Sequence, residues 1–174
     1  MMILLSFTGG NLSIADFGNT MYPNALDQKG YRYPRDSLLQ AYDFVKDDEI
    51  RNPKNLEANG EQCLFVVKNG RTTGTTVGRS NGLESFTRSY PDYGIVLTSL
   101  EIAVLPYSKK RGKFSDAGDS GSIVLARDGR IVGILTGGRG PTNETDISYL
   151  TPYWWIEKQL KHKIPGCCLY DVVQ

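Results

Sequence analysis

The sequence predicts an all-β domain, an antiparallel β-barrel or sandwich followed by one helix. Two observations support this fold class. After Gly60 the chain consists of short β-rich runs separated by turn residues, and near Pro152 the apolar period changes from that of a strand to that of a helix. With 174 residues and 40% hydrophobic content, the chain can bury one ordinary core. The expected strands are residues 63–68, 72–78, 84–90, 95–105, 122–126, 131–136 and 147–150.

Residues 1–59 lack this pattern and predict an irregular connector, or the remnant of a preceding half. They are rich in Pro, Gly, Asn and Tyr, and only residues 37–45 carry apolar side chains at helical spacing. Asp36 or Ser37 is the expected cap of that short helix, and Pro53 ends anything beyond it. The expected organisation is a connector, a β-barrel domain with its closing helix, and a tail, at 1–59, 60–165 and 166–174.

Turn residues and a final helical pattern complete the predicted domain. Asn69-Gly70 and Asp128-Gly129 each lie between apolar runs and supply residues that tolerate positive φ, which tight hairpins require. Residues 152–163 predict a helix that begins at Thr151-Pro152. One face of this helix carries Trp155, Ile156, Gln159 and Leu160, and the other carries Glu157, Lys158, Lys161 and Lys163.

Charge and cysteine content exclude several classes of function. The net charge is +1 and the Lys and Arg residues are scattered, so we expect neither nucleic acid nor an anionic membrane as partner. Cys63, Cys167 and Cys168 form neither a disulfide framework nor a metal-ligand set, and we expect no metal and no cofactor. The first residues do not resemble a signal peptide, and no apolar run is long enough to span a bilayer. This favours a reducing, intracellular compartment, although a chain that begins within a larger gene would lose its signal.

The segment from Phe114 to Val124, FSDAGDSGSIV, is the most informative part of the chain. A serine hydroxyl needs a base to become a nucleophile, and acyl transfer needs donors directed at the oxyanion. Gly118 can adopt backbone angles closed to other residues, which would direct the amides of Gly118 and Ser120 toward one point. In isolation, Gly-Asp-Ser-Gly is equally typical of a plain turn.

Residues 114–138 resemble the chymotrypsin-like family, the trypsin-like (S1-type) serine peptidases of the PA clan. In that family Gly-Asp-Ser-Gly leads into a strand, a short turn and a second strand, as do residues 122–126, 128–129 and 131–136 here. The second strand ends in the substrate-binding edge, where this chain has Thr136, Gly137 and Gly138, and an extended peptide would pair there as an added strand. With the hairpin at 67–78 and the final helix, the resemblance covers residues 60–163 and implies the C-terminal barrel of the trypsin-like double barrel.

This resemblance implies a nucleophile without a base. Ser120 takes the place of the nucleophile, the amides of Gly118 and Ser120 that of the oxyanion hole, and Asp119 supports the loop. The family's catalytic His and Asp come from an N-terminal barrel, and residues 1–59 contain no histidine. His162 is either a solvated surface residue or a substitute base, and Lys113 is a second candidate base. We assign neither the base nor the orienting carboxylate.

The sequence defines the primary substrate pocket less clearly than it defines the Ser120 loop. By position relative to Ser120, Phe114 and Ser115 would form the floor of the primary pocket and Asp116 its rim, or Phe114 would simply belong to the core.

Three functions are consistent with these residues. The first is the nucleophile-bearing half of a serine endopeptidase, a hydrolase inactive alone, whose partners are a peptide or protein substrate and a missing N-terminal barrel. The second is a non-catalytic peptide- or protein-binding module, a pseudopeptidase that uses the cleft edge. The third is an independent hydrolase with an unconventional base. The sequence leaves cleavage specificity and oligomeric state open.

Overall fold

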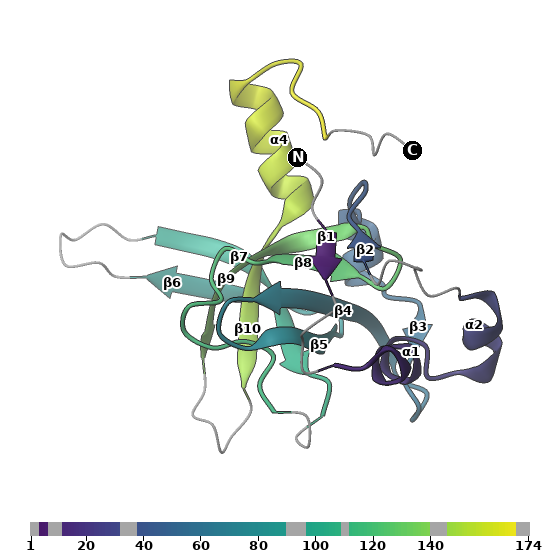
Figure 1. Ribbon diagram of the computed structural model, residues 1–174. Helices are drawn as coiled ribbons and strands as arrows, with labels where there is room; N and C mark the ends of the chain where they lie inside the picture. The colour runs from purple at the N-terminus through teal and green to yellow at the C-terminus, as the bar shows by residue number, and fades with distance from the viewer. Residues whose placement is uncertain are drawn as a thin grey trace.

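Six antiparallel strands close into a barrel in this computed structural model, which describes residues 4–6, 12–31, 38–89, 97–108, 112–139 and 146–169 (Figure 1). Neighbouring strands pair in the order β10-β9-β8-β4-β5-β7, and β10 also pairs with β7, which closes the barrel. An additional strand, β6 (Glu84–Ser89), extends the sheet from β7. The barrel strands are β4 (Gln62–Gly70), β5 (Gly74–Ser80), β7 (Leu97–Pro106), β8 (Ile123–Ala126), β9 (Ile131–Arg139) and β10 (Ile147–Pro152).

The barrel wall around β4 is buried on both faces, so the chain has two hydrophobic clusters. Successive side chains of a strand point to opposite faces, and from Cys63 to Val67 both sets are apolar and buried. One set, with Leu64 and Val66, belongs to a cluster that includes Ile102, Val124 and Leu150 from other barrel strands. The other set joins a second cluster, with Cys63, Phe65 and Val67.

The second cluster is completed by the N-terminal segment. Helix α1 (Ile14–Met21) begins at Ser13, whose hydroxyl accepts a hydrogen bond from the Asp16 amide at 3.1 Å, and it buries Phe17 and Met21 against β4. Burial of these side chains removes apolar surface of both the helix and the barrel wall from water. The other N-terminal elements are α2 (Ala25–Gly30), α3 (Asp47–Arg51) and three short strands, β1 (Leu4–Ser6), β2 (Leu38–Gln40) and β3 (Asn55–Leu56).

The predicted antiparallel barrel is confirmed, and each predicted strand overlaps one of β4 to β10. The helix predicted at 37–45 is wrong, because Leu38–Gln40 pairs with β1 and Phe44 forms a bridge with Ile131; Asp36 and Ser37 lie outside the described residues. The turn at Asp128-Gly129 is present, with Gly129 at φ 95. Asn69-Gly70, in contrast, belongs to β4, and the chain turns at the following three residues.

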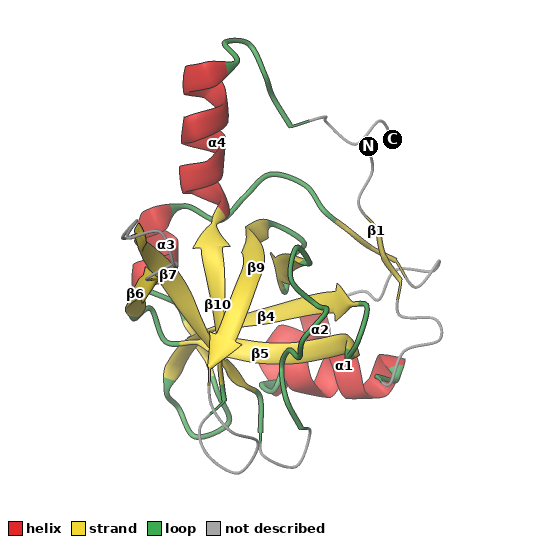
Figure 2. Cartoon of the chain, turned by 90° about the vertical axis from the view of Figure 1, so that its left-hand side faces the viewer, coloured by secondary structure: helices red, strands yellow, loops and turns green. Residues whose placement is uncertain are grey.

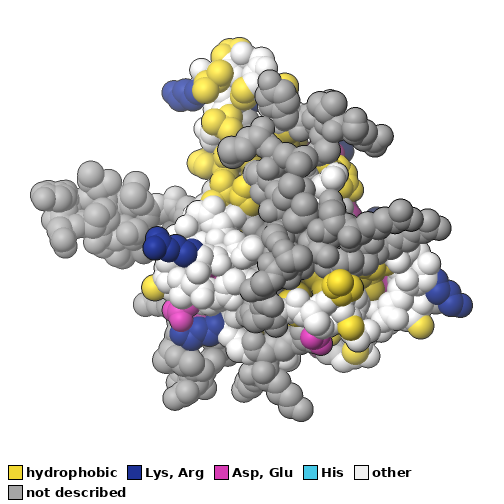
Figure 3. All heavy atoms as spheres, viewed as in Figure 1, with side chains coloured by type: hydrophobic (Ala, Val, Ile, Leu, Met, Phe, Trp, Pro, Cys, Tyr) yellow, Lys and Arg dark blue, Asp and Glu magenta, His cyan; other side chains and the backbone are white. Residues whose placement is uncertain are grey.

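The C-terminal helix α4 (Tyr153–Lys163) forms as predicted, with little packing against the barrel. Figure 2 shows it standing away from the barrel, and none of its residues is buried. Only its first turn touches the clusters, through Tyr153 and Trp154. Apolar side chains therefore remain exposed on α4, as Figure 3 shows, among them Trp155 and Leu160. In the part of the chain that the structure describes, no helix has the length and apolar character to cross a membrane.

We predict that the N-terminal segment unfolds together with the barrel. Phe17→Ala should lower the free energy of unfolding by about 3–5 kcal/mol, because Phe17 is fully buried against β4. Phe86→Ala is the matched control, since Phe86 is 69% exposed and its loss should cost no more than about 0.5 kcal/mol. Urea unfolding followed by tryptophan fluorescence and by far-UV circular dichroism measures both. Separate transitions in the two signals would show that the segment is an independent unit.

Candidate functional site

A buried ion pair fixes the loop that carries Ser120. Lys68 occupies a fully buried position of β4, and its Nζ lies 3.1 Å from Asp119 Oδ2, with neither side chain exposed to solvent. The Asp119 carboxylate also accepts hydrogen bonds from the amides of Thr72 (2.7 Å), Thr73 (3.2 Å) and Asp116 (3.1 Å) and from the Thr73 hydroxyl (2.6 Å). Burial raises the pKa of Asp119, but these donors outweigh it and hold the pKa well below its usual range.

The β4–β5 hairpin holds the same loop at two further points. The Thr72 hydroxyl donates to the Ala117 carbonyl at 2.8 Å, and the Thr76 hydroxyl donates to the Phe114 carbonyl at 2.6 Å. Because both contacts are to backbone carbonyls, they fix the path of the main chain rather than side-chain positions. The loop therefore has one arrangement, set by β4, β5 and the turn between them.

Gly118 has a positive φ, a backbone conformation that glycine adopts readily and other residues rarely do. Its φ is 98, and a Cβ there would come within 2.5 Å of Thr72 Oγ1. Among the described residues, the Gly118 and Ser120 amides have no hydrogen-bond partner, while the amides of Asp119 and Gly121 donate to the carbonyls of Asp116 and Leu135. Two amides close to an exposed serine side chain thus remain available to a ligand.

Ser120 lines a pocket of ≈ 300 Å³ at one end of the barrel. Part of its wall is β9, whose Gly137 and Gly138 pair with β10 on one side. On the other side, the last hydrogen bonds of β9 join Leu135 to Gly121 and Ser122, and beyond them no described residue pairs with this edge. Thr136, in turn, uses its hydroxyl to bind the Tyr149 carbonyl at 3.1 Å. The structure therefore brings Ser120, the pocket and an open strand edge together.

Among the described residues, the charged side chains that line the pocket are those of Lys113, Asp116 and Asp146. Lys113 Nζ lies 3.1 Å from Asp116 Oδ2, and a hydrogen bond from the Ala117 amide, together with Lys113, lowers the pKa of Asp116. Burial raises the pKa of Asp146, which Lys113 offsets only in part. Asp146 was not predicted from the sequence. An aspartate just before a strand has no sequence signal that places it at a pocket, and only the fold brings it there.

The predicted pocket floor is partly wrong. Phe114 is fully buried in the barrel cluster, with its ring centroid 5.7 Å from Lys68 Nζ, and it does not line the pocket. Ser115 does line the pocket, and its Oγ lies 2.6 Å from Ser148 Oγ in a buried hydroxyl pair. Asp116 also lies at the pocket, as expected from its position. Phe114 therefore belongs to the hydrophobic core, the second of the two expectations, and not to the pocket floor.

The two candidate bases differ in position. Lys113 lines the same pocket as Ser120, but its Nζ is engaged with Asp116. His162 is exposed in the last turn of α4. Because β10 runs from the pocket toward α4 and a strand rises roughly 3.3 Å per residue, the pocket and α4 lie at opposite ends of this strand. His162 is thus an exposed residue remote from Ser120.

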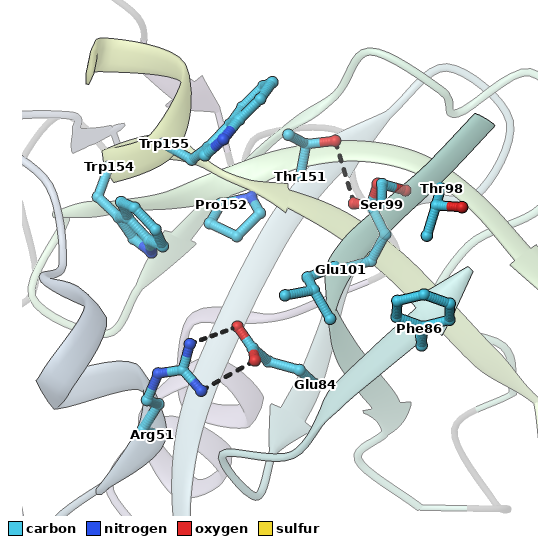
Figure 4. A pocket seen from close by; sticks show the side chains of 11 residues that line it. Arg51, Glu84, Phe86, Thr98, Ser99, Glu101, Thr151, Pro152, Trp154 and Trp155 are labelled. Carbon is cyan, nitrogen blue, oxygen red and sulfur yellow. Dashed lines mark hydrogen bonds and ion pairs between the residues drawn. The ribbon is translucent and has the colours of Figure 1, made fainter. Parts of the chain in front are cut away.

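A larger cavity of ≈ 500 Å³ lies at the α4 end of β10 (Figure 4). Trp154 and Trp155 form one side and Phe86 another, and Glu84 accepts two hydrogen bonds from Arg51 at its rim (2.8 and 2.9 Å). Glu101 is held there by the Thr151 hydroxyl at 3.0 Å. None of these residues lines the Ser120 pocket. In neither cavity, nor elsewhere among the described residues, do His, Cys, Asp or Glu side chains gather as a metal site would require.

Solved structures of chymotrypsin-like proteases are similar to this chain. They include Cellulomonas bogoriensis chymotrypsin (17% identity, TM-score 0.44, 76% of this chain and 57% of that chain). Another is Thermobifida fusca protease A (18% identity, TM-score 0.39, 71% of this chain and 53% of that chain). A third is the Rv3671c protease of M. tuberculosis in its active form (16% identity, TM-score 0.43, 80% of this chain and 64% of that chain). The chain thus spans less than two thirds of the length of each of these proteases. At these identities and TM-scores, the likeness is no evidence of shared catalytic chemistry. No protein-family model and no curated protein matches the sequence.

We predict that Lys68 and Asp119 are strongly coupled. Lys68→Met leaves a buried carboxylate and Asp119→Asn leaves a buried ammonium, so each should lower the free energy of unfolding by about 3–5 kcal/mol. The double variant removes both charges and should lose clearly less than the sum of the two single variants. Urea unfolding of the four proteins measures this cycle. Additive losses would mean that the two side chains act independently.

Proposed function

We propose that this chain is the nucleophile-bearing barrel of a serine endopeptidase. Ser120 would attack the peptide carbonyl, and the amides of Gly118 and Ser120 would bind the oxyanion. The observation that carries this proposal is the loop itself. An exposed serine follows a glycine at φ 98, and the Asp119 between them is held by a buried lysine. A plain turn has no need of a buried ion pair that fixes its backbone.

The strand edge supports a peptide as substrate. Gly137 and Gly138 line the Ser120 pocket, and beyond Leu135 the edge of β9 on that side has no partner among the described residues. An extended peptide added to this edge would satisfy its backbone groups and would bring one side chain to the pocket. Thr136 would contribute to the edge through its backbone, since its hydroxyl is already bonded to Tyr149.

The general base would come from outside the described residues. Ser120 shares its pocket with Lys113, which is paired with Asp116, and His162 lies at the far end of β10. Without a base, preformed oxyanion donors supply only part of the rate enhancement of a serine peptidase. The chain alone should therefore have negligible peptidase activity, and a missing N-terminal barrel remains the partner we propose.

A non-catalytic peptide- or protein-binding module is the second candidate. It is favoured by the observation that the part of the pocket that the structure describes holds no histidine and that its Lys113 is bound to Asp116. In that case the edge and the pocket would bind an extended peptide, and Ser120 would be only one of the contacts. The two candidates differ in whether Ser120 can be made to react.

We predict that an added base makes Ser120 reactive. Imidazole, whose neutral form is a small diffusible base, should accelerate labelling of the purified chain by a fluorophosphonate, because a base is the component that the proposed site lacks. The rate should follow the concentration of neutral imidazole, and intact-protein mass spectrometry measures it. Peptide-ester turnover without imidazole should remain at background.

Two variants control this experiment. Ser120→Ala should abolish the labelling, whereas Ser99→Ala, which removes an exposed hydroxyl on β7, should leave it unchanged. Gly118→Ala should reduce it strongly, since a Cβ at φ 98 displaces the first oxyanion donor. If no labelling occurs at any imidazole concentration, the peptidase proposal fails and the binding module is favoured.

A further inference from the structure

We propose that the cavity between β7 and the start of α4 binds a small N-alkylated ammonium compound, a cation of the same kind as choline. Trp154, Trp155 and Phe86 form its aromatic walls, and Glu101 supplies the negative charge. No described residue lines both this cavity and the Ser120 pocket. The inference therefore does not rest on the proposed function.

The cavity forms where two barrel strands separate. The pairing of β7 with β10 ends where Leu150 lies opposite Ile102. Beyond that point β10 continues into α4, whereas residues 97–101 of β7 pair only with β6 among the described residues. The separation leaves a volume of ≈ 500 Å³, which is within the usual range of small-molecule pockets.

Aromatic side chains stand on two sides of this cavity. Figure 4 shows Trp154 and Trp155 on one side and Phe86 on another. Trp155 is 47% exposed and Phe86 is 69% exposed, so these rings keep apolar surface that a core would bury. Exposed apolar side chains that gather in one place mark a binding site. The faces of aromatic rings also attract cations, and the face of tryptophan does so most strongly.

Glu101 provides a negative charge inside the same cavity. It is only 6% exposed, and its Oε2 accepts hydrogen bonds from the hydroxyls of Thr151 (3.0 Å) and Thr136 (3.5 Å). No described cation forms an ion pair with it, whereas Glu84 at the same cavity is bound to Arg51 at 2.8 Å. A buried carboxylate is normally paired with a cation, so Glu101 is complementary to a positively charged ligand.

The walls favour a cation that carries no N–H group. A free ammonium or guanidinium group has several donors, and each needs an acceptor once the group leaves water. The walls of this cavity are mainly apolar, and Glu101 Oε2 already accepts from two hydroxyls. A trimethylammonium group has its charge within a shell of methyl groups, so it can contact aromatic rings and needs no hydrogen bonds.

The test compares choline with 3,3-dimethylbutan-1-ol, in which carbon replaces the charged nitrogen. Both tryptophans of the chain line the cavity, so tryptophan fluorescence reports binding directly. We predict that choline binds about tenfold more tightly than the alcohol, because only choline gains from the aromatic faces and from Glu101. Equal or tighter binding of the alcohol, or no saturable change of fluorescence with either compound, would overturn the proposal.

Two variants assign the preference to residues of the cavity. Glu101→Gln keeps an oxygen that can accept from Thr151 and removes the charge, so it should reduce the choline-to-alcohol ratio at least about threefold. Phe86→Leu keeps an apolar side chain and removes an aromatic face, and it should reduce the ratio about two- to fivefold. A ratio that neither variant changes contradicts the assignment.

Glu61→Gln is the matched control for the loss of charge. Glu61 is exposed and lies outside the cavity, so this variant should keep the ratio of the parent chain. Far-UV circular dichroism shows whether each variant is folded, and an unchanged affinity for the neutral alcohol shows that the cavity of Glu101→Gln is intact. If Glu61→Gln lowers the ratio as much as Glu101→Gln, the preference reflects the overall charge of the chain and the proposal fails.

A third ligand distinguishes a free compound from a modified protein side chain. N-acetyl-trimethyllysine methylamide carries the same trimethylammonium group with a peptide-like backbone. We expect it to bind no more tightly than choline, since the cavity has the size of a small-molecule pocket. Clearly tighter binding would reject the free compound as the ligand. None of these titrations involves Ser120, so their outcome is independent of the fluorophosphonate experiment.

Discussion

The ion pair between Lys68 and Asp119 determines the arrangement of everything around Ser120. Both side chains are fully buried, so each loses its hydration, a cost of several kcal/mol per ion that only close pairing and further hydrogen bonds can offset. The Asp119 carboxylate has such partners in the turn between β4 and β5 and in its own loop. A displaced loop would leave one of these charges buried and unpaired. The hairpin and the loop are thereby locked in one relative position.

This constraint also explains why glycines stand where they do. A Cβ at Gly70 would collide with the Asp119 carboxylate and would come within 2.8 Å of Lys68 Nζ, so the ion pair requires a residue without a side chain at the end of β4. Gly118 is required for a different reason, its φ of 98 on the loop that the pair holds. Because the groups that fix this backbone all come from the chain itself, orientation of the Gly118 and Ser120 amides does not depend on a partner.

Sequence reasoning succeeded where the signal is local and failed where it depends on tertiary contacts. The strand pattern predicted β4 to β10, since alternation along a strand reports directly on two faces. Asn69-Gly70 was misread as the turn, because a glycine needed for close approach looks the same in sequence as one needed for positive φ. The helix pattern at 37–45 was overridden by pairing with β1. The loop around Ser120 was found by its motif, whereas Asp146 and Lys68 are brought to the site only by barrel closure.

The two proposed functions share one binding site and differ in whether Ser120 is catalytic. The pocket, the open edge of β9 and the loop amides lie together at one end of the barrel, and they are built from the chain's own strands. Among the described residues of the pocket there is no histidine to accept the proton of Ser120, and Lys113 is bound to Asp116. Under either proposal, recognition of a peptide would be a property of the barrel alone.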